Sequence, residues 1–136
     1  MKTPAARMPD LDTPVDIRRE QSALVITIND QATRNAMGET LFNKGRKALE
    51  EARDDHSVRS VILTGAGGTF CSGGNLGMLA TLRQMPQERT ESAFAEFHGF
   101  IKAIQAMPVP VIAAVEGDAA GAGFSMALAS DFIIAS

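Results

Sequence analysis

The feature that most constrains the fold is a short apolar run followed at once by a glycine-dense loop, SVILTGAGGTFCSGGNL, at residues 60–76. Residues 60–64 are rich in β-branched side chains and end at a glycine, which predicts a buried strand of a parallel sheet. Glycines then occupy positions 65, 67, 68, 73 and 74, a density that indicates left-handed dihedral angles or close approach of the backbone to a ligand. Asn75 precedes the apolar spacing of a short helix and is expected to cap it. The loop therefore directs free backbone N–H groups beyond the end of a strand, where a negative charge is stabilised.

The rest of the chain repeats the order of strand, loop and helix. Strands are expected at residues 15–20, 23–28, 111–115 and 132–134, and the dipeptide Gln21-Ser22 is expected to join the first two in a hairpin. Apolar spacing predicts helices over residues 39–53, 88–107 and 121–130, and small residues at 117–123 form a second loop behind a strand. A strand–helix–strand order of this length implies a parallel sheet with right-handed crossovers.

Composition excludes several classes of function. With 136 residues, 45% of them hydrophobic and 21% charged, the chain is at most one globular domain. A formal net charge of −3 argues against a nucleic-acid partner, and no stretch reaches the roughly 20 apolar residues of a membrane span. One cysteine excludes an internal disulfide and fits a reducing compartment, and the N-terminus has no apolar core typical of a secretory signal. We expect a cytoplasmic protein with no membrane partner, in which residues 1–12 form a flexible tail and residues 13–136 form the domain.

Glycine-rich loops also bind nucleotides, but neither loop here has a complete nucleotide motif. The dinucleotide fingerprint G-x-G-x-x-G needs a final glycine where the first loop has Phe70 and the second has Met126. A phosphate-binding loop would need Lys followed by Ser or Thr after its last glycine, and Asn75 follows it instead. Both nucleotide interpretations are therefore disfavoured.

A serine-hydrolase interpretation would take residues 123–127, GFSMA, as a partial nucleophile elbow with Ser125 as the nucleophile. Ser125 lies several residues beyond the end of the predicted strand, whereas the elbow needs a sharp turn. A hydrolase of this type also needs an acid and a histidine downstream, and both histidines, His56 and His98, lie upstream. Neither histidine is expected to bind a metal, and no metal site is predicted.

The two loops together fit a third chemistry. Two backbone N–H groups from separate strand–loop–helix units can converge on one oxygen and stabilise a thioester enolate or a tetrahedral oxyanion. The run Arg34-Asn35-Ala36-Met37, residues 58–76 and residues 111–136 resemble the enoyl-CoA hydratase/isomerase, or crotonase, superfamily. The resemblance implies an α/β fold, the crotonase-type ββα spiral, here its N-terminal part without the later C-terminal helical region.

The same resemblance implies a site. The two oxyanion-binding N–H groups would belong to Gly74 and Ala122, and the substrate would be a coenzyme A thioester, with no permanently bound cofactor. Contacts with coenzyme A or the substrate are implied for Arg34, Ala36, Ser72, Gly73, Asn75, Leu76 and Gly121. The family also implies a homo-oligomer, a trimer or a hexamer, in which the missing C-terminal segment could be present as a second chain.

Ser125 stands where hydratases of this family carry a catalytic glutamate. A hydroxyl does not act as a general acid or base near neutral pH without a partner, so the expected reaction is more isomerase-like than hydratase-like. The alternative is a non-catalytic member of the family that binds acyl-CoA or a partner protein. Four apolar residues after the first loop are candidates for an acyl pocket or for the core: Met78, Leu79, Leu82 and Met85.

Two further expectations concern packing. Cys71 has no histidine near it in sequence and is expected to be a packed, unreactive thiol. The three predicted parallel strands at 60–64, 111–115 and 132–134 are almost wholly apolar, so both faces of the sheet need cover. The chain offers too few helices for both, and we expect residues 1–136 not to form a self-sufficient monomer.

Overall fold

The computed structural model describes residues 14–136, so the tail predicted for residues 1–12 lies outside the described residues. The elements follow in the order β1 (Val15–Glu20), β2 (Ala23–Ile28), η1 (Gln31–Thr33), η2 (Leu41–Gly45), α1 (Arg46–Arg53), β3 (Ser60–Gly65), α2 (Leu76–Leu82), α3 (Gln87–Gln105), β4 (Val111–Val115), α4 (Ala122–Ala129) and β5 (Phe132–Ala135). All five strands predicted from the sequence are confirmed, each to within one residue at either end. Among these residues no helix is both long enough and apolar enough to cross a membrane.

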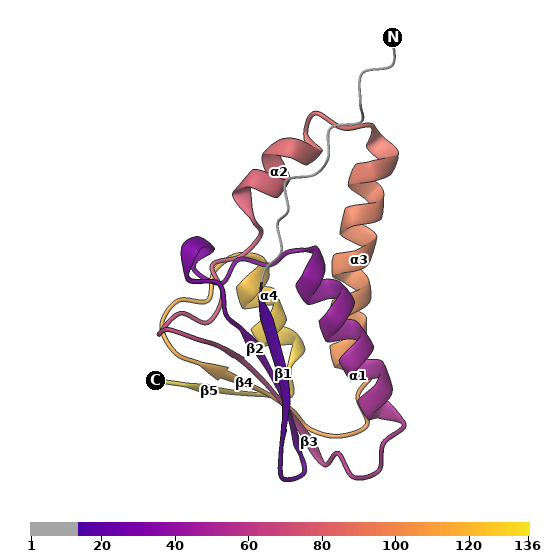
Figure 1. Ribbon diagram of the computed structural model, residues 1–136, viewed down its shortest axis with the longest axis vertical. Coiled ribbons are helices and arrows are strands. Elements are labelled where there is room, and N and C mark those ends of the chain that lie inside the picture. The colour runs from indigo at the N-terminus through magenta and orange to yellow at the C-terminus, as the bar shows by residue number, and fades with distance from the viewer. Residues whose placement is uncertain (1–13) are drawn as a thin grey trace.

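The strands form one sheet in the order β1-β2-β3-β4-β5 (Figure 1). β1 and β2 form an antiparallel hairpin, and its turn residue Gln21 has a φ of 54°. From β2 to β5 all pairs are parallel. Parallel strands end at the same edge of a sheet, so the segments that leave β2, β3 and β4 emerge side by side. The functional loops predicted from the sequence are therefore neighbours in space.

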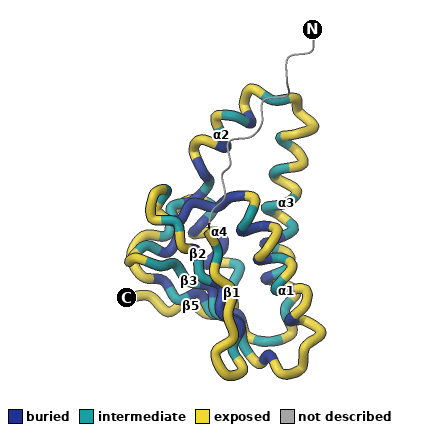
Figure 2. Tube along the Cα trace, in the orientation of Figure 1, coloured by how far each residue is buried: buried dark blue, intermediate teal, exposed yellow. Residues whose placement is uncertain are grey.

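Side chains alternate across the parallel strands, and one face of the sheet is much better covered than the other. Val61 and Leu63 of β3 are buried with Val111 and Ala113 of β4, and α1 and α3 pack together on one side of the sheet (Figures 1 and 2). On the opposite face of the same strands Ile62 and the other alternate residues are only partly buried. The helices of the described chain thus cover one face.

The helix predicted over residues 39–53 differs from the observed one in its first turns. It begins as the wide π-helical turn η2, followed by α1. This segment packs closely on α3. The contact is tight at Gly45, where an added Cβ atom would lie 2.7 Å from Cε2 of the buried Phe100. Single π turns occur often at functional sites. Here the turn buries both Leu41 and Phe42.

Five large apolar side chains remain exposed on α4 and β5, and we call this set the α4–β5 surface. Its members are apolar side chains more than two-fifths exposed: Phe124 (51%), Leu128 (61%), Phe132 (60%), Ile133 (45%) and Ile134 (66%). Apolar clusters of this kind mark interaction sites or aggregation hazards. The expected shortage of cover is therefore observed at the β5 edge of the sheet.

A buried asparagine holds the loop after β2 against the loop after β3. Asn35 is fully buried, with a φ of 61°. Its Nδ2 donates to the carbonyl oxygens of Ala66, at 2.9 Å, and Thr69, at 2.7 Å. Its Oδ1 accepts a hydrogen bond of 2.8 Å from the Asp30 N–H. The amide nitrogen thus makes two hydrogen bonds within the loops, and the amide oxygen accepts one.

Replacing this amide should cost a large part of the stability. Asn35→Asp keeps the size and tolerates the left-handed backbone, but it places a carboxylate against two carbonyl oxygens that then have no donor. We expect a loss of about 2–4 kcal/mol in the free energy of unfolding, measured by urea denaturation of the full-length protein.

The matched control is Asn43→Asp in η2, where the side chain is exposed and makes no hydrogen bond within residues 14–136. A change within about 0.5 kcal/mol is expected there. Equal denaturation midpoints for Asn35→Asp and the unmodified protein would contradict the structural role assigned to Asn35.

Candidate functional site

The loop after β2 and the loop after β3 run side by side through backbone hydrogen bonds. The Met37 N–H donates to the Gly73 carbonyl oxygen at 2.7 Å, and the Asn75 N–H donates to the Met37 carbonyl oxygen at 3.2 Å. One step earlier, Ser72 donates from its N–H to the Arg34 carbonyl oxygen, at 3.1 Å, and from its hydroxyl to the Thr33 carbonyl oxygen, at 2.8 Å. The two segments that carry most of the predicted coenzyme A contacts are therefore brought together.

The second small-residue loop, after β4, lies against the first. Phe70 and Cys71 both donate backbone hydrogen bonds of 3.1 Å to the Asp118 carbonyl oxygen, and Ala120 donates one of 3.0 Å to Cys71. Gly73 lies at one of the close contacts between the two loops. Its φ is 106°, and a Cβ atom there would lie 2.9 Å from the Ala120 carbonyl oxygen and 3.7 Å from the Ala122 nitrogen. Only glycine fits at this contact without strain.

Two backbone N–H groups at this junction remain unused. The bonds between the first two loops use the Gly73 carbonyl and the Asn75 N–H, and they skip the N–H of Gly74. Ala122 is the first residue of α4, so its N–H has no partner inside the helix. Within residues 14–136 neither N–H donates a hydrogen bond to another residue. The start of α4 also contributes the positive end of the helix dipole.

Gly74 and Ala122, the residues that carry these N–H groups, both line one cavity of about 400 Å³. The cavity is lined by Met37, Phe42, Gly74, Met78, Leu79, Leu82, Ala93, Phe94, Phe97, Gly121 and Ala122. Apart from the backbone at the two loops its walls are apolar, and no ionisable side chain of the described chain lines it. Such a space fits an apolar group attached to an atom that accepts hydrogen bonds.

The apolar residues singled out after the first loop divide between this cavity and its neighbours. Met78, Leu79 and Leu82 line it, as one of the two predicted roles requires, whereas Met85 lines only adjacent hollows. Helix α2, which carries Met78, Leu79 and Leu82, is capped as predicted, because the Asn75 side-chain oxygen accepts a 3.1 Å hydrogen bond from the Met78 N–H. Leu76 projects into solvent at 81% exposure.

Arg34 and Ala36 occupy very different environments. Arg34 has a left-handed backbone, and its guanidinium donates a 2.7 Å hydrogen bond to the Asp118 carboxylate in an exposed ion pair. Such a pair contributes little to stability, because water screens both charges. Ala36 is buried, and its N–H donates to the Thr33 hydroxyl at 3.1 Å. Arg34 is therefore the member of this segment with a charged group at the surface.

Ser125 lies on the exposed side of α4, outside the lining of the 400 Å³ cavity. Its hydroxyl donates to the Gly121 carbonyl oxygen at 3.4 Å, a bond within the first turn of the helix. In the described chain no histidine or carboxylate contacts that hydroxyl. The geometry that a serine nucleophile needs is not present in these residues.

Cys71 is fully buried between the loops, as expected of a packed thiol. Burial raises the pKa of its thiol to about 11, although a backbone hydrogen bond from Gly73 acts in the opposite direction. The group therefore stays protonated near neutral pH and is a poor nucleophile. Within residues 14–136 no three His, Cys, Asp or Glu side chains are close enough together to hold a metal ion.

Sequence reasoning missed three contributors to this site. Asn35 was recognised only as part of a motif, and nothing in its spacing signals a buried amide with three bonds. Phe42 and Phe97 lie within the helices that apolar spacing predicts over residues 39–53 and 88–107, and they line the cavity with ring centroids 5.7 Å apart. Their apolar spacing was a signal for burial, but it did not distinguish a core position from a cavity wall.

Comparison with known proteins agrees with this geometry. The sequence pattern of the enoyl-CoA hydratase/isomerase family matches residues 18–136. A probable enoyl-CoA hydratase of Mycobacterium tuberculosis, EchA14, is 37% identical over 122 residues, which are 90% of this chain and 46% of that protein. A probable enoyl-CoA hydratase of Rhodobacter capsulatus is 38% identical over 115 residues, 82% of this chain and 41% of that protein.

Solved structures show the same relationship. An enoyl-CoA hydratase from Polaromonas sp. JS666 superposes with a TM-score of 0.86 at 42% identity, over 90% of this chain and 48% of that one. AtuE of Pseudomonas aeruginosa superposes with a TM-score of 0.85 at 35% identity, over 90% of this chain and 47% of that one. The chain therefore spans about half the length of the relatives it matches. On its sequence, its α/β fold and its paired glycine loops, the chain belongs to the enoyl-CoA hydratase/isomerase, or crotonase, family.

Proposed function

We propose that this chain is the thioester-binding part of an enzyme that acts on acyl-CoA. The Gly74 and Ala122 N–H groups bind the thioester carbonyl oxygen and stabilise the negative charge that develops there as an enolate forms. The observation that carries the proposal is that both donors are unused within residues 14–136 and belong to residues that line the same apolar cavity. Donors held in place by folding need no reorganisation during the reaction, which makes such an oxyanion hole effective.

Coenzyme A would enter as part of the substrate, along the seam between the loops after β2 and β3. Arg34 and Ala36 lie on one side of the seam, and Ser72, Gly73 and Asn75 lie on the other. Leu76 and Gly121 complete the predicted contacts. The exposed Arg34 guanidinium supports this placement, since it is a positive group that could bind a phosphate of coenzyme A in exchange for Asp118.

The proposed reaction is isomerase-like. Hydration of a double bond needs one group to activate water and usually a second to deliver a proton, whereas double-bond migration needs one proton shuttle. Neither Ser125 nor any ionisable side chain of the described residues lines the cavity. The shuttle would then come from a segment or subunit outside the described residues.

A second candidate is a member of the family that binds acyl-CoA, or only a partner protein, without catalysis. The apolar lining of the cavity favours this candidate, because binding needs no acid or base. Turnover screened over enoyl-, dienoyl- and β-keto-acyl-CoA, together with calorimetry for binding, separates the two functions.

We further propose that a polypeptide segment outside the described residues, or another subunit, covers the α4–β5 surface. The candidates are further subunits of a trimer or hexamer, or a C-terminal segment supplied in the same chain or as a second chain. The exposed apolar side chains support this proposal, and so does the length of the relatives, of which this chain spans about half.

Removing one oxyanion donor tests the main proposal. The Ala122→Pro substitution removes the backbone N–H at the first position of α4, where a helix tolerates proline. We expect turnover of the best substrate in the screen to fall by about 100- to 1,000-fold. Ala122→Gly is the control, because it keeps the N–H, and it should retain turnover within about tenfold. Equal turnover by the proline variant and the unmodified full-length protein would refute the role of Ala122.

The effect of having serine rather than glutamate at position 125 is tested by the Ser125→Glu substitution. We expect the full-length protein to hydrate a short enoyl-CoA weakly, and Ser125→Glu to raise that rate by about tenfold or more, if a second acid is supplied elsewhere. Ser125→Gln has the same length but cannot transfer a proton, so it should give no increase. Rapid hydration by the unmodified protein, measured by loss of enoyl absorbance, would contradict the isomerase-like assignment.

Exposure of the α4–β5 surface predicts the behaviour of the isolated 136-residue chain. Size-exclusion chromatography with light scattering should show self-association or aggregation, because the exposed apolar area favours contact between copies. The double substitution Phe124→Glu and Ile134→Glu should reduce it, whereas Ile17→Glu, a substitution at a similarly apolar exposed residue on β1, should not. A soluble, cooperative and active monomer would overturn the prediction.

A further inference from the structure

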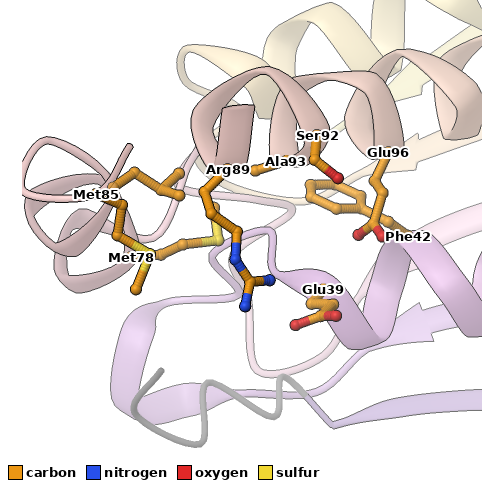
Figure 3. A pocket seen from close by; sticks show the side chains of 9 residues that line it. Glu39, Phe42, Met78, Met85, Arg89, Ser92, Ala93 and Glu96 are labelled. Atoms are coloured by element: carbon orange, nitrogen blue, oxygen red, sulfur yellow. The ribbon is translucent and has the colours of Figure 1, made fainter. Parts of the chain in front are cut away.

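A second, smaller cavity adjoins the apolar cavity on the side away from the two glycine loops. It measures about 80 Å³, and we call it the end pocket (Figure 3). Four residues line both spaces: Phe42, Met78, Leu82 and Ala93. These shared side chains lie at the border of the two spaces, and methionine is the side chain that most readily changes shape. A chain of atoms that fills the apolar cavity would therefore extend toward the end pocket past these shared side chains.

The end pocket differs from the apolar cavity in carrying charge. Glu39 lies just before η2, and Arg89, Ser92 and Glu96 lie on successive turns of α3. Figure 3 shows the Arg89 guanidinium and the carboxylates of Glu39 and Glu96 directed toward the same space. Within residues 14–136 none of these three charged groups forms an ion pair or a side-chain hydrogen bond. Their hydrogen-bonding capacity is available to a ligand.

The environment of Glu96 is unfavourable for a lone carboxylate. The residue is partly buried, and burial together with the nearby charge of Glu39 raises the pKa of its carboxyl group, while Arg46 lowers it. A group that donates a hydrogen bond to Glu96 would offset the lost hydration.

The mixture of charges limits which group fits. A ligand carboxylate would be attracted by Arg89 but repelled by two glutamates, and an ammonium would be attracted by the glutamates but repelled by Arg89. Glu39 and Arg89 are exposed and Glu96 is partly buried, so a methyl group would cover mainly the Glu96 carboxyl group and return no hydrogen bond. A hydroxyl accepts one hydrogen bond and donates another, so it satisfies a guanidinium and a carboxylate together without adding charge.

We propose that the end pocket binds a hydroxyl group at the far end of the substrate's acyl chain, which accepts a hydrogen bond from Arg89 and donates one to Glu96. The inference rests on the proposed function, since it requires the acyl chain to occupy the apolar cavity. It specifies the substrate class as an acyl-CoA with a hydroxylated tail. Phe42 and Met78 then separate the reacting end of the chain from the recognised end.

The test is calorimetric binding to the full-length protein of three saturated thioesters: ω-hydroxydecanoyl-CoA, decanoyl-CoA and decanedioyl-CoA, repeated with the hexanoyl and octanoyl series. Saturated chains carry no double bond to react, so the measurement reports binding. At the chain length that reaches the pocket, the hydroxylated thioester should bind about fivefold or more tightly than the methyl-ended one. The dicarboxylic thioester should bind no more tightly than the methyl-ended one.

Arg89→Met keeps most of the length and removes the donor, and it should bring the hydroxyl and methyl affinities to within about twofold of each other. Glu91→Gln is the matched control, on the same helix but outside the pocket lining, and it should preserve the preference. Equal affinities in the unmodified protein at every length, or a preference for the dicarboxylic thioester, would overturn the hydroxyl assignment and leave the proposed function intact. Failure of every thioester to bind would refute both.

Discussion

The side-chain amide of Asn35 is the interaction on which the rest of the site depends. Three loop segments leave the carboxyl edge of the parallel sheet, and such segments carry many backbone polar groups that strand pairing does not satisfy. Asn35 bonds to three of them, on Asp30, Ala66 and Thr69, from a fully buried position. With the loop after β2 fixed to the loop after β3, Met37 can pair with Gly73 and Asn75. An amide is needed, because the position requires donors and an acceptor on one short side chain.

The two unused N–H groups follow from this pairing. A short parallel bridge uses the peptide groups of alternate residues, so Gly74, between two bonded neighbours, has its N–H directed away from Met37. Ala122 has an unused N–H for a different reason, since the first turn of any helix leaves its donors unpaired. The contact between Gly73 and the loop after β4 brings these unrelated donors to one cavity. The site is thus made from what secondary structure leaves unsatisfied, with no dedicated polar side chain.

The strands and the Asn75 cap could be predicted because their causes are local. Residues 60–64 form a short, mostly apolar run that fits a buried strand. Asn75 stands directly before an apolar helix, where it can act as the cap. Convergence of the loops was also predictable, since parallel strands end at one edge. Asn35 was not, because its partners lie 31 and 34 residues away and exist only after the sheet has formed. The π turn at η2 likewise packs on a residue far along the chain, since its Gly45 lies against the ring of Phe100.

The position of Ser125 shows why the proposed binding of an oxyanion and the transfer of a proton are separable in this fold. The Gly74 and Ala122 N–H groups are backbone atoms, so substitutions along α4 leave them in place provided the helix starts at the same residue. A proton-transfer group is a side chain, and its reach and pKa change with one substitution. The Ser125 hydroxyl donates to the Gly121 carbonyl oxygen of the same helix and makes no hydrogen bond with the Gly74 or Ala122 N–H. With the proposed oxyanion hole, the fold would keep one way of stabilising an enolate while the source and destination of the proton, and with them the reaction, change.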